Sequence, residues 1–125
     1  MQVKNVRDLL VWQRAMDLAH QVYQLVPTFP FDERYGLSSQ LRRSAVSIPS
    51  NVAEGWGYGK TGRYLHHLRI ARGSECELRT QLELAQRLRL CDADRVALML
   101  QNAHEVGMML SGLIRSLENS ADSDS

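Results

Sequence analysis

The chain has 125 residues, of which 44% are hydrophobic and 23% charged, which is enough for one domain with a single hydrophobic core. It has no apolar run near the roughly 18 residues of a membrane span and no secretory pattern at its start, so we expect a cytoplasmic protein with no membrane partner. Cys76 and Cys91 lie outside any CxxC spacing. In a reducing compartment they are expected to be small apolar fillers rather than a disulfide.

The net charge of +1 is unevenly distributed along the chain. Residues 38–74 carry six basic residues against one acidic residue, a balance of +5, whereas residues 75–125 carry five against nine, a balance of −4. A chain folded back on itself can therefore present one basic and one acidic face. Binding of a polyanion and head-to-tail association of subunits are both compatible with this pattern.

The first helix is predicted over residues 7–25, where two apolar stripes alternate spacings of three and four residues. One stripe consists of Leu9, Trp12, Met16, Ala19, Tyr23 and Val26, and the other of Val11, Ala15, Leu18, Val22 and Leu25. One stripe can face the core of a bundle. The other then needs a second covering, for which a neighbouring subunit is the simplest candidate, and a wide core face in a compact monomer is the alternative.

Pro27 and Pro30 are expected to end this helix, and the apolar side chains of Phe29 and Phe31 to plug one end of the bundle. The stripe of the second helix consists of Leu37, Leu41, Ala45, Ile48 and Val52. This helix contains Pro49, which costs about 3 kcal/mol in a helix interior. Because the apolar register continues past Pro49, one kinked helix is favoured over two short ones. Nearby serines are placed to satisfy the freed backbone groups.

Four glycines follow at positions 55, 57, 59 and 62. Residues 57–62 match GxGxxG, but the dinucleotide fingerprint needs a preceding strand, and a helix is predicted here. Gly59, Lys60 and Thr61 mimic the end of a phosphate-binding P-loop, yet the glycine expected five residues earlier is Glu54. The glycines are better explained as a hinge between the second and third helices.

The third helix is predicted over residues 62–89, with a heptad seam of Tyr64, Leu68, Ala71, Glu75, Leu78, Leu82 and Ala85. Glu75 is expected to pair with an arginine or to lie at a wet axis, because a lone buried charge is too costly. Gly73 and Ser74 suggest a tight helix crossing. Asp92 is a good N-cap for the fourth helix, whose predicted seam consists of Val96, Met99, Ala103, Val106, Leu110, Leu113 and Leu117. The polar segment 118–125 is expected to be a disordered tail after a domain spanning 1–117.

These elements predict an all-α protein, an antiparallel up-and-down four-helix bundle whose second helix is kinked at Pro49. Such bundles can hold dinuclear metal sites through Glu-x-x-His motifs, but no glutamate here has histidine three residues later. No ordered spacing of serine, histidine and acid indicates a nucleophile. We therefore predict no metal, no cofactor and no enzymatic activity.

Three segments carry a family resemblance: RDLLVWQRAMDLA, YGLSSQLRRSAVSIPSNVAEGWG and YLHHLRIARGSECELRTQL. Over residues 7–117 the chain resembles the four-helix bundle proteins encoded in intervening sequences of bacterial 23S ribosomal RNA genes. The resemblance implies an antiparallel four-helix bundle assembled as a ring, typically a homopentamer. The chain is also distantly similar to the accessory variability determinant of diversity-generating retroelements, a pentamer whose basic surface binds nucleic acid and a reverse transcriptase.

Two functional hypotheses follow. The first is an oligomeric RNA-binding module, in which basic side chains contact phosphates and two aromatic rings stack on unpaired bases. Its candidate residues are Arg42, Arg43, Trp56, Tyr58, Lys60, Arg63, Arg69 and Arg72. The second is a structural or adaptor oligomer that binds a protein partner, in which case the same charges can form ion pairs between subunits.

Overall fold

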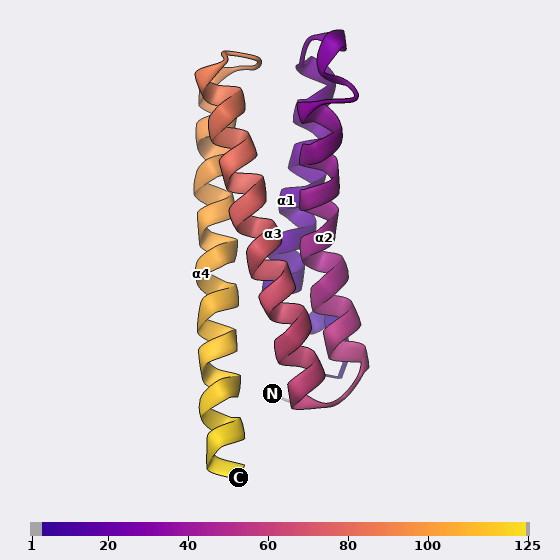
Figure 1. Ribbon diagram of the computed structural model, residues 1–125, viewed down its shortest axis with the longest axis vertical. Coiled ribbons are helices and arrows are strands. Elements are labelled where there is room, and N and C mark those ends of the chain that lie inside the picture. Colours follow the sequence, from indigo (N-terminus) through magenta and orange to yellow (C-terminus); the bar gives the residue numbers. More distant parts are fainter. Residues whose placement is uncertain (1–3, 125) are drawn as a thin grey trace.

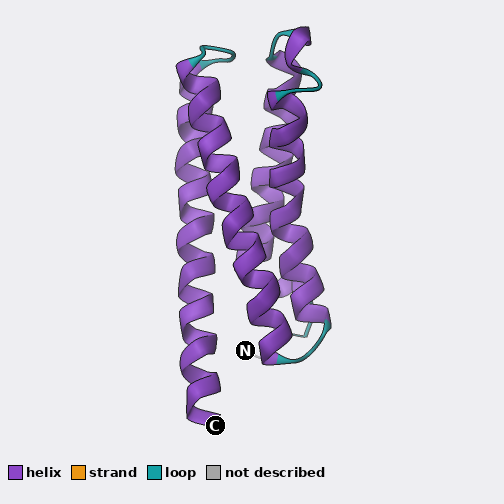
Figure 2. Cartoon of the chain, in the orientation of Figure 1, coloured by secondary structure: helices purple, strands orange, loops and turns teal. Residues whose placement is uncertain are grey.

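The computed structural model describes residues 4–124, and these form only helices and connecting loops (Figure 2). The four long helices are α1 (Leu10–Leu25), α2 (Leu37–Gly57), α3 (Thr61–Arg87) and α4 (Ala93–Asp124). Three short 3-10 turns accompany them: η1 (Val6–Asp8), η2 (Val26–Thr28) and η3 (Phe31–Glu33). The predicted all-α class and four-helix bundle are confirmed.

The four long helices pack around a common core, because each contacts the next in sequence and α4 also contacts α1. Figure 1 shows that consecutive helices run in opposite directions. The α1–α2 and α3–α4 connections lie at one end of the bundle, and the α2–α3 connection lies at the other. Segments that are distant in sequence, such as the starts of α2 and α4, therefore share one end.

The structure decides which stripe of the first helix faces the core. Val11, Ala15, Leu18, Val22 and Leu25 are buried between the helices. Of the other stripe, Trp12 is partly buried, whereas Met16 and Tyr23 are 44% and 48% exposed. Ala19 and Val26 of the same stripe are buried, so this stripe is uncovered only in part, around Met16 and Tyr23.

The first helix begins later than predicted. Leu9 is extended, with ψ of 121°, and separates α1 from the turn η1. Asn5 caps that turn by accepting a hydrogen bond from the backbone N–H of Arg7 at 2.9 Å. The apolar periodicity thus located the helix but not its first turn.

The second helix is continuous through Pro49, as the single-helix prediction requires, while the bend itself stays a prediction. The serines do not act as expected. The Ser44 hydroxyl lies 2.7 Å from Gln81 Oε1 and 2.9 Å from the Gln40 carbonyl, and Ser47 pairs with Ser74. Pro49 has no N–H to donate to the Ala45 carbonyl, and no serine side chain among residues 4–120 donates to that carbonyl instead.

The seam of the third helix is buried as predicted at Leu68, Leu78 and Leu82. The seam of the fourth helix is buried as predicted as far as Leu110, after which Ile114 is buried while Leu113 and Leu117 are only partly buried. Glu75 is buried within the α3 seam and pairs with Arg79, which confirms the expected arginine partner. Of the two cysteines, Cys91 packs against the core, whereas Cys76 is exposed and is not a filler.

The close helix approach is not at Gly73, where a Cβ would meet nothing within 4 Å. It is at Gly55 on α2, where a Cβ would lie 2.8 Å from the His67 Cβ and 3.2 Å from the Tyr64 Cα on α3. Gly107 on α4 plays a similar part, because a Cβ there would overlap the Glu75 carboxylate. Which glycines permit close packing depends on helix rotation, which sequence spacing does not fix.

The predictions made for residues at the helix ends are confirmed at some positions and wrong at others. Phe29 is buried as predicted, but Phe31 is 71% exposed and plugs nothing. Asp92 caps α4 by accepting a hydrogen bond from the Arg95 N–H at 2.9 Å. The helix α4 is described as far as Asp124, while Ser125 lies outside the described residues, and the division into a domain 1–117 and a tail 118–125 stays a prediction.

Candidate nucleic-acid interface

Half of the predicted interface residues come together where α2 ends and α3 begins. We call Trp56, Tyr58, Lys60 and Arg63 the loop cluster. Gly59 has φ of +67°, a left-handed conformation that favours glycine and lets the chain reverse within a short loop. The Tyr58 ring stacks on the His67 ring with 5.6 Å between the ring centroids, and the Arg63 guanidinium lies 4.8 Å from the Tyr58 centroid. Tyr58 remains 47% exposed, so a ring and two cations share one open surface.

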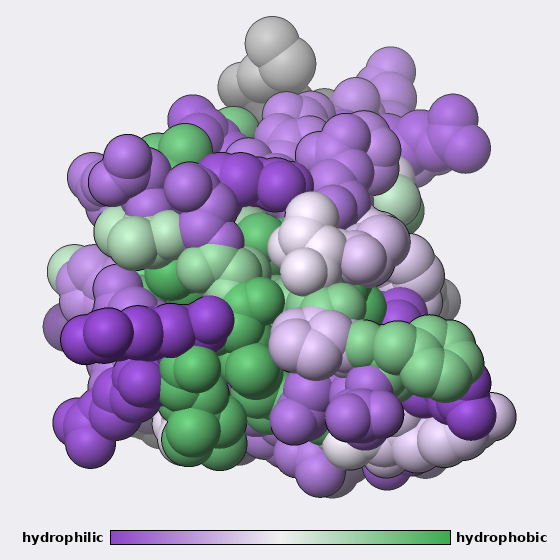
Figure 3. Space-filling model, turned by 90° about the horizontal axis from the view of Figure 1, so that it is seen from above, coloured by the Kyte–Doolittle hydropathy of each residue, from purple (hydrophilic) through white to green (hydrophobic). Residues whose placement is uncertain are grey.

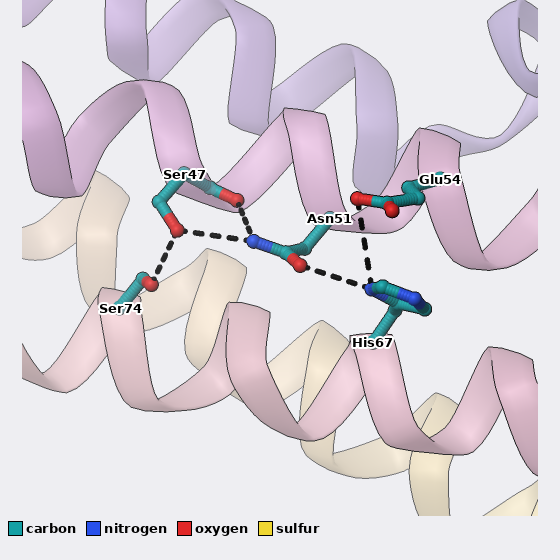
Figure 4. Close-up of polar contacts among 5 residues, drawn as sticks. All are labelled: Ser47, Asn51, Glu54, His67 and Ser74. Carbon is teal, nitrogen blue, oxygen red and sulfur yellow. Dashed lines mark hydrogen bonds and ion pairs between the residues drawn. The ribbon is translucent and has the colours of Figure 1, made fainter.

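A chain of polar side chains joins α2 to α3 (Figure 4). Ser74 and Ser47 pair at 2.7 Å, and Asn51 Nδ2 donates to the Ser47 carbonyl at 2.8 Å. Because a carbonyl only accepts, the amide nitrogen of Asn51 faces Ser47 and its oxygen faces His67 Nδ1, 3.1 Å away.

The orientation of Asn51 fixes the tautomer of His67. The Asn51 oxygen can only accept, so the proton of neutral His67 sits on Nδ1 and leaves Nε2 as an acceptor. Glu54 Oε2 is 3.9 Å from the same nitrogen and adds only weak electrostatic attraction. The segment Ser47–Glu54 therefore holds the ring on which Tyr58 stacks, a role that sequence spacing had left open.

Arg42 and Arg43 lie elsewhere. They are on the first half of α2, about 20 Å along the helix from Trp56. Arg42 donates a 3.5 Å hydrogen bond to the Arg34 carbonyl at the opposite end of the bundle. The eight predicted residues thus do not form one continuous patch.

A second aromatic and cationic group at that end was not predicted. The Arg34 guanidinium lies 3.8 Å from the Phe31 ring centroid and 4.6 Å from that of Tyr35, and we call these three residues the tip cluster. Phe31 and Tyr35 are 71% and 84% exposed. Figure 3, which looks onto this end, shows apolar surface between polar side chains. The alternation of aromatic and charged residues in FDERY was the available signal.

Arg69 and Arg72 lie on α3 towards α4. Arg69 pairs with Glu118 at 3.3 Å, with both side chains about half exposed. Arg72 lines a small hollow between the two helices, beside Arg79 and His104. These two arginines therefore form a third group, separate from the loop cluster and from the end that carries Arg42.

The carboxyl group of Glu75 forms the floor of that hollow. Its side chain is 1% exposed, and Arg79 Nε lies 3.0 Å from Oε2 while Arg79 Nη2 donates to Oε1 at 3.3 Å. Burial raises the pKa of Glu75 above its ordinary value, and the charges of Arg79 and His104 oppose that rise. The pair is thus a buried ion pair with one partner open to solvent.

The uncovered stripe of α1 forms a groove with α2. This groove has a volume of about 670 Å³ and is lined by Trp12, Met16, Ala19, His20, Tyr23, Val46, Pro49, Ser50 and Ala53. Only His20 and Ser50 are polar. An exposed apolar groove of this kind is found where another protein or an apolar ligand binds.

Two kinds of site are not found in the part of the chain that the structure describes. No three side chains of histidine, cysteine, aspartate or glutamate gather there closely enough to hold a metal ion. Among the same residues, no helix has the length and apolar character to cross a membrane.

Comparison with known proteins gives a family and a fold. The family model described as 23S rRNA-intervening sequence protein matches residues 7–112. The solved structure of a protein of unknown function from the S23 ribosomal protein family of Bacteroides thetaiotaomicron is similar, with a TM-score of 0.77. The two chains are 21% identical, and the match covers 84% of this chain and 98% of the other. No curated protein matched.

Proposed function

Since the chain belongs to the family of 23S rRNA-intervening sequence proteins, we propose that it is a non-enzymatic homo-oligomeric bundle that binds RNA. The observation that carries this proposal is the loop cluster. It combines an exposed aromatic ring with Lys60 and Arg63, neither of which has an ion-pair partner among the described side chains, those of residues 4–120. Unpaired cations neutralise phosphates, and an unpaired base can stack on the exposed Tyr58 ring by displacing the Arg63 guanidinium that lies over it.

The groove between α1 and α2 supports the oligomeric part of the proposal. It lies on helices that contribute their other faces to the core, so a neighbouring subunit can cover it without disturbing the fold. The family resemblance implies a ring of five subunits. With a chain mass of 14.2 kDa, light scattering on such a ring gives about 71 kDa.

The test of RNA binding is a salt series with a labelled single-stranded RNA, followed by fluorescence anisotropy. Binding to phosphates weakens linearly on a log-log plot, with a slope of about −0.7 for each neutralised phosphate. We expect the double variant Lys60→Gln and Arg63→Gln to reduce the magnitude of the slope by about 1.4. The matched control neutralises Arg87 and Arg95, which are also exposed but lie outside the loop cluster.

Absence of wild-type binding at low salt excludes the RNA function. An equal loss in both double variants shows that net charge, rather than the loop cluster, determines binding. The double variant Arg42→Gln and Arg43→Gln tests the other end of α2 in the same series.

A structural or adaptor oligomer that binds a protein partner is the second candidate, and the tip cluster favours it. Exposed aromatic and arginine side chains are enriched among residues that dominate protein–protein binding energy. Asp32 and Glu33 lie between Phe31 and Arg34, which makes this end less attractive to phosphates. If RNA binding is absent, comparison of partner capture by wild type and the Phe31→Ala, Tyr35→Ala variant tests this alternative.

A further inference from the structure

The hollow between α3 and α4 gathers hydrogen-bond donors from both helices. It has a volume of about 130 Å³ and is lined by Arg72, Arg79, His104 and Ser111, with Glu75 at its floor and Cys76, Gly107 and Met108 around it. A water molecule in the liquid takes about 30 Å³, so the space suits a group of four or five heavy atoms. We call this space the α3–α4 hollow.

Glu75 holds Arg79 in place rather than acting as a free acid. Its two oxygens lie 3.0 Å and 3.3 Å from nitrogens of Arg79, and Gly107 leaves the room that the carboxylate occupies. A charge this deeply buried is kept only when it is paired. The arginine side chain is 36% exposed, so its guanidinium spans from the buried carboxylate to the surface.

The contact between Arg79 and His104 fixes the proton on the imidazole. Arg79 Nη1 lies 3.1 Å from His104 Nδ1, and a guanidinium nitrogen only donates. His104 Nδ1 therefore accepts, and the proton of the neutral ring sits on Nε2. This leaves a second donor on an exposed side chain that lines the hollow.

The remaining lining groups also donate. Arg72 has no ion-pair partner among the side chains of residues 4–120, and Ser111 contributes a hydroxyl. Two guanidinium groups against one carboxylate leave the lining with a charge of +1 when His104 is neutral. Planar guanidinium groups are well matched to the oxygens of phosphate.

We propose that the α3–α4 hollow is a phosphate-binding site, in which Arg72, Arg79, His104 and Ser111 donate to the oxygens of one phosphate group. Glu75 is a positioning residue that aims Arg79. The phosphate group can belong to an RNA backbone, and this assignment rests on the proposed function. It can also belong to free phosphate or to a small phosphorylated molecule, and that assignment does not depend on the proposed function.

The first arm of the test uses inorganic phosphate on the full chain. Amide resonances are followed by heteronuclear NMR during a titration with phosphate, with chloride at the same ionic strength as the reference. We expect shifts that saturate and that are confined to the residues lining the hollow. Arg72→Gln should abolish them, whereas Arg87→Gln on the same helix should not. Because Arg72 has no ion-pair partner in the described residues, its replacement should leave the unfolding midpoint unchanged.

The second arm uses the labelled RNA and the salt series. If the site takes a backbone phosphate, Arg72→Gln lowers the magnitude of the slope by about 0.7 and Arg87→Gln does not. Phosphate shifts without a change in the RNA slope support the site and assign it to a free phosphate. If phosphate causes no saturating shifts and Arg72→Gln and Arg87→Gln give equal slopes, the proposed phosphate site is wrong. If wild type binds no RNA, the proposed function fails and the phosphate arm alone decides this inference.

Discussion

Glu75 is an acid that the fold buries, and its burial links the stability of the bundle to pH. Burial raises its pKa above the ordinary value of 4.5, and the charges of Arg79 and His104 only oppose this. The folded state therefore keeps a proton at pH values where the unfolded chain has released it. For this group the free energy of unfolding falls as pH rises from 4.5 through the raised pKa.

Replacement of Glu75 by glutamine removes that titration while keeping an acceptor for Arg79. We expect the unfolding free energy of Glu75→Gln, relative to wild type, to rise as pH increases from 4.5 through the raised pKa of Glu75. The rise is about 1.4 kcal/mol for each unit by which the folded-state pKa exceeds the unfolded one. Urea unfolding of both proteins at each pH measures it. If the difference in unfolding free energy between Glu75→Gln and wild type stays constant or falls as pH rises, the raised pKa of Glu75 is contradicted.

Gly55 and Gly73 make a matched pair of helical glycines with opposite environments. A Cβ at Gly55 meets Tyr64 and His67 close to the α3 backbone, where neither can easily move, so Gly55→Ala should destabilise by about 1–3 kcal/mol. At Gly73 a Cβ meets nothing, so Gly73→Ala should stabilise by about 0.5–1 kcal/mol through helix propensity. Chemical unfolding compares them, and equal effects would contradict the close approach of α2 and α3.

The element most open to experiment is α1, because its outer stripe lines the groove. Met16 in the groove and Met108 on α4 are both exposed methionines, at 44% and 63%. If a second subunit covers the groove, Met16→Glu places an unpaired charge in an apolar interface and should yield monomers, whereas Met108→Glu should keep the wild-type mass. Light scattering measures the mass. A wild type that is already monomeric contradicts the oligomer proposal directly.

At the level of the helices, the sequence predicted the core stripes that depend on local periodicity. It did not predict features that depend on how each helix is rotated about its axis relative to its neighbours. The stripes of α2, α3 and α4 were found because each has a single apolar register. On α1 two stripes fit equally well, so the choice between Met16 and Leu18 as core residues needed the neighbouring helices.

The same limit applies to the candidate sites. Trp56, Tyr58, Lys60 and Arg63 were predicted together because they are close in sequence. The partnership of Arg79 with Glu75 is a spacing of four residues and could be expected. The contributions of His104 and Gly107 could not, because they depend on the register of α4 against α3.

At the scale of the whole molecule, the candidate surfaces lie on different sides of the bundle. The groove lies between α1 and α2, the α3–α4 hollow lies between the other two helices, and the loop cluster lies at one end. In a ring each subunit offers two different faces to its neighbours, so a subunit in the groove leaves both cationic surfaces free only if its own contacting face excludes them. In the proposed oligomer the free surfaces are repeated, so a modest site in each chain can give strong binding to a long RNA.

This separation predicts that a groove variant weakens RNA binding without changing any basic residue. For an RNA of about 10 nucleotides, within the span of a single site, Met16→Glu should bind as wild type does. For one several times longer, the loss of simultaneous contacts should weaken binding by about 100-fold or more. The control Leu98→Glu replaces an exposed α4 side chain (55%) that lines neither the groove nor the hollow, and it should match wild type on both RNAs. An equal loss on short and long RNA would mean that Met16 acts on the binding surface or on the fold, and that assembly contributes no avidity.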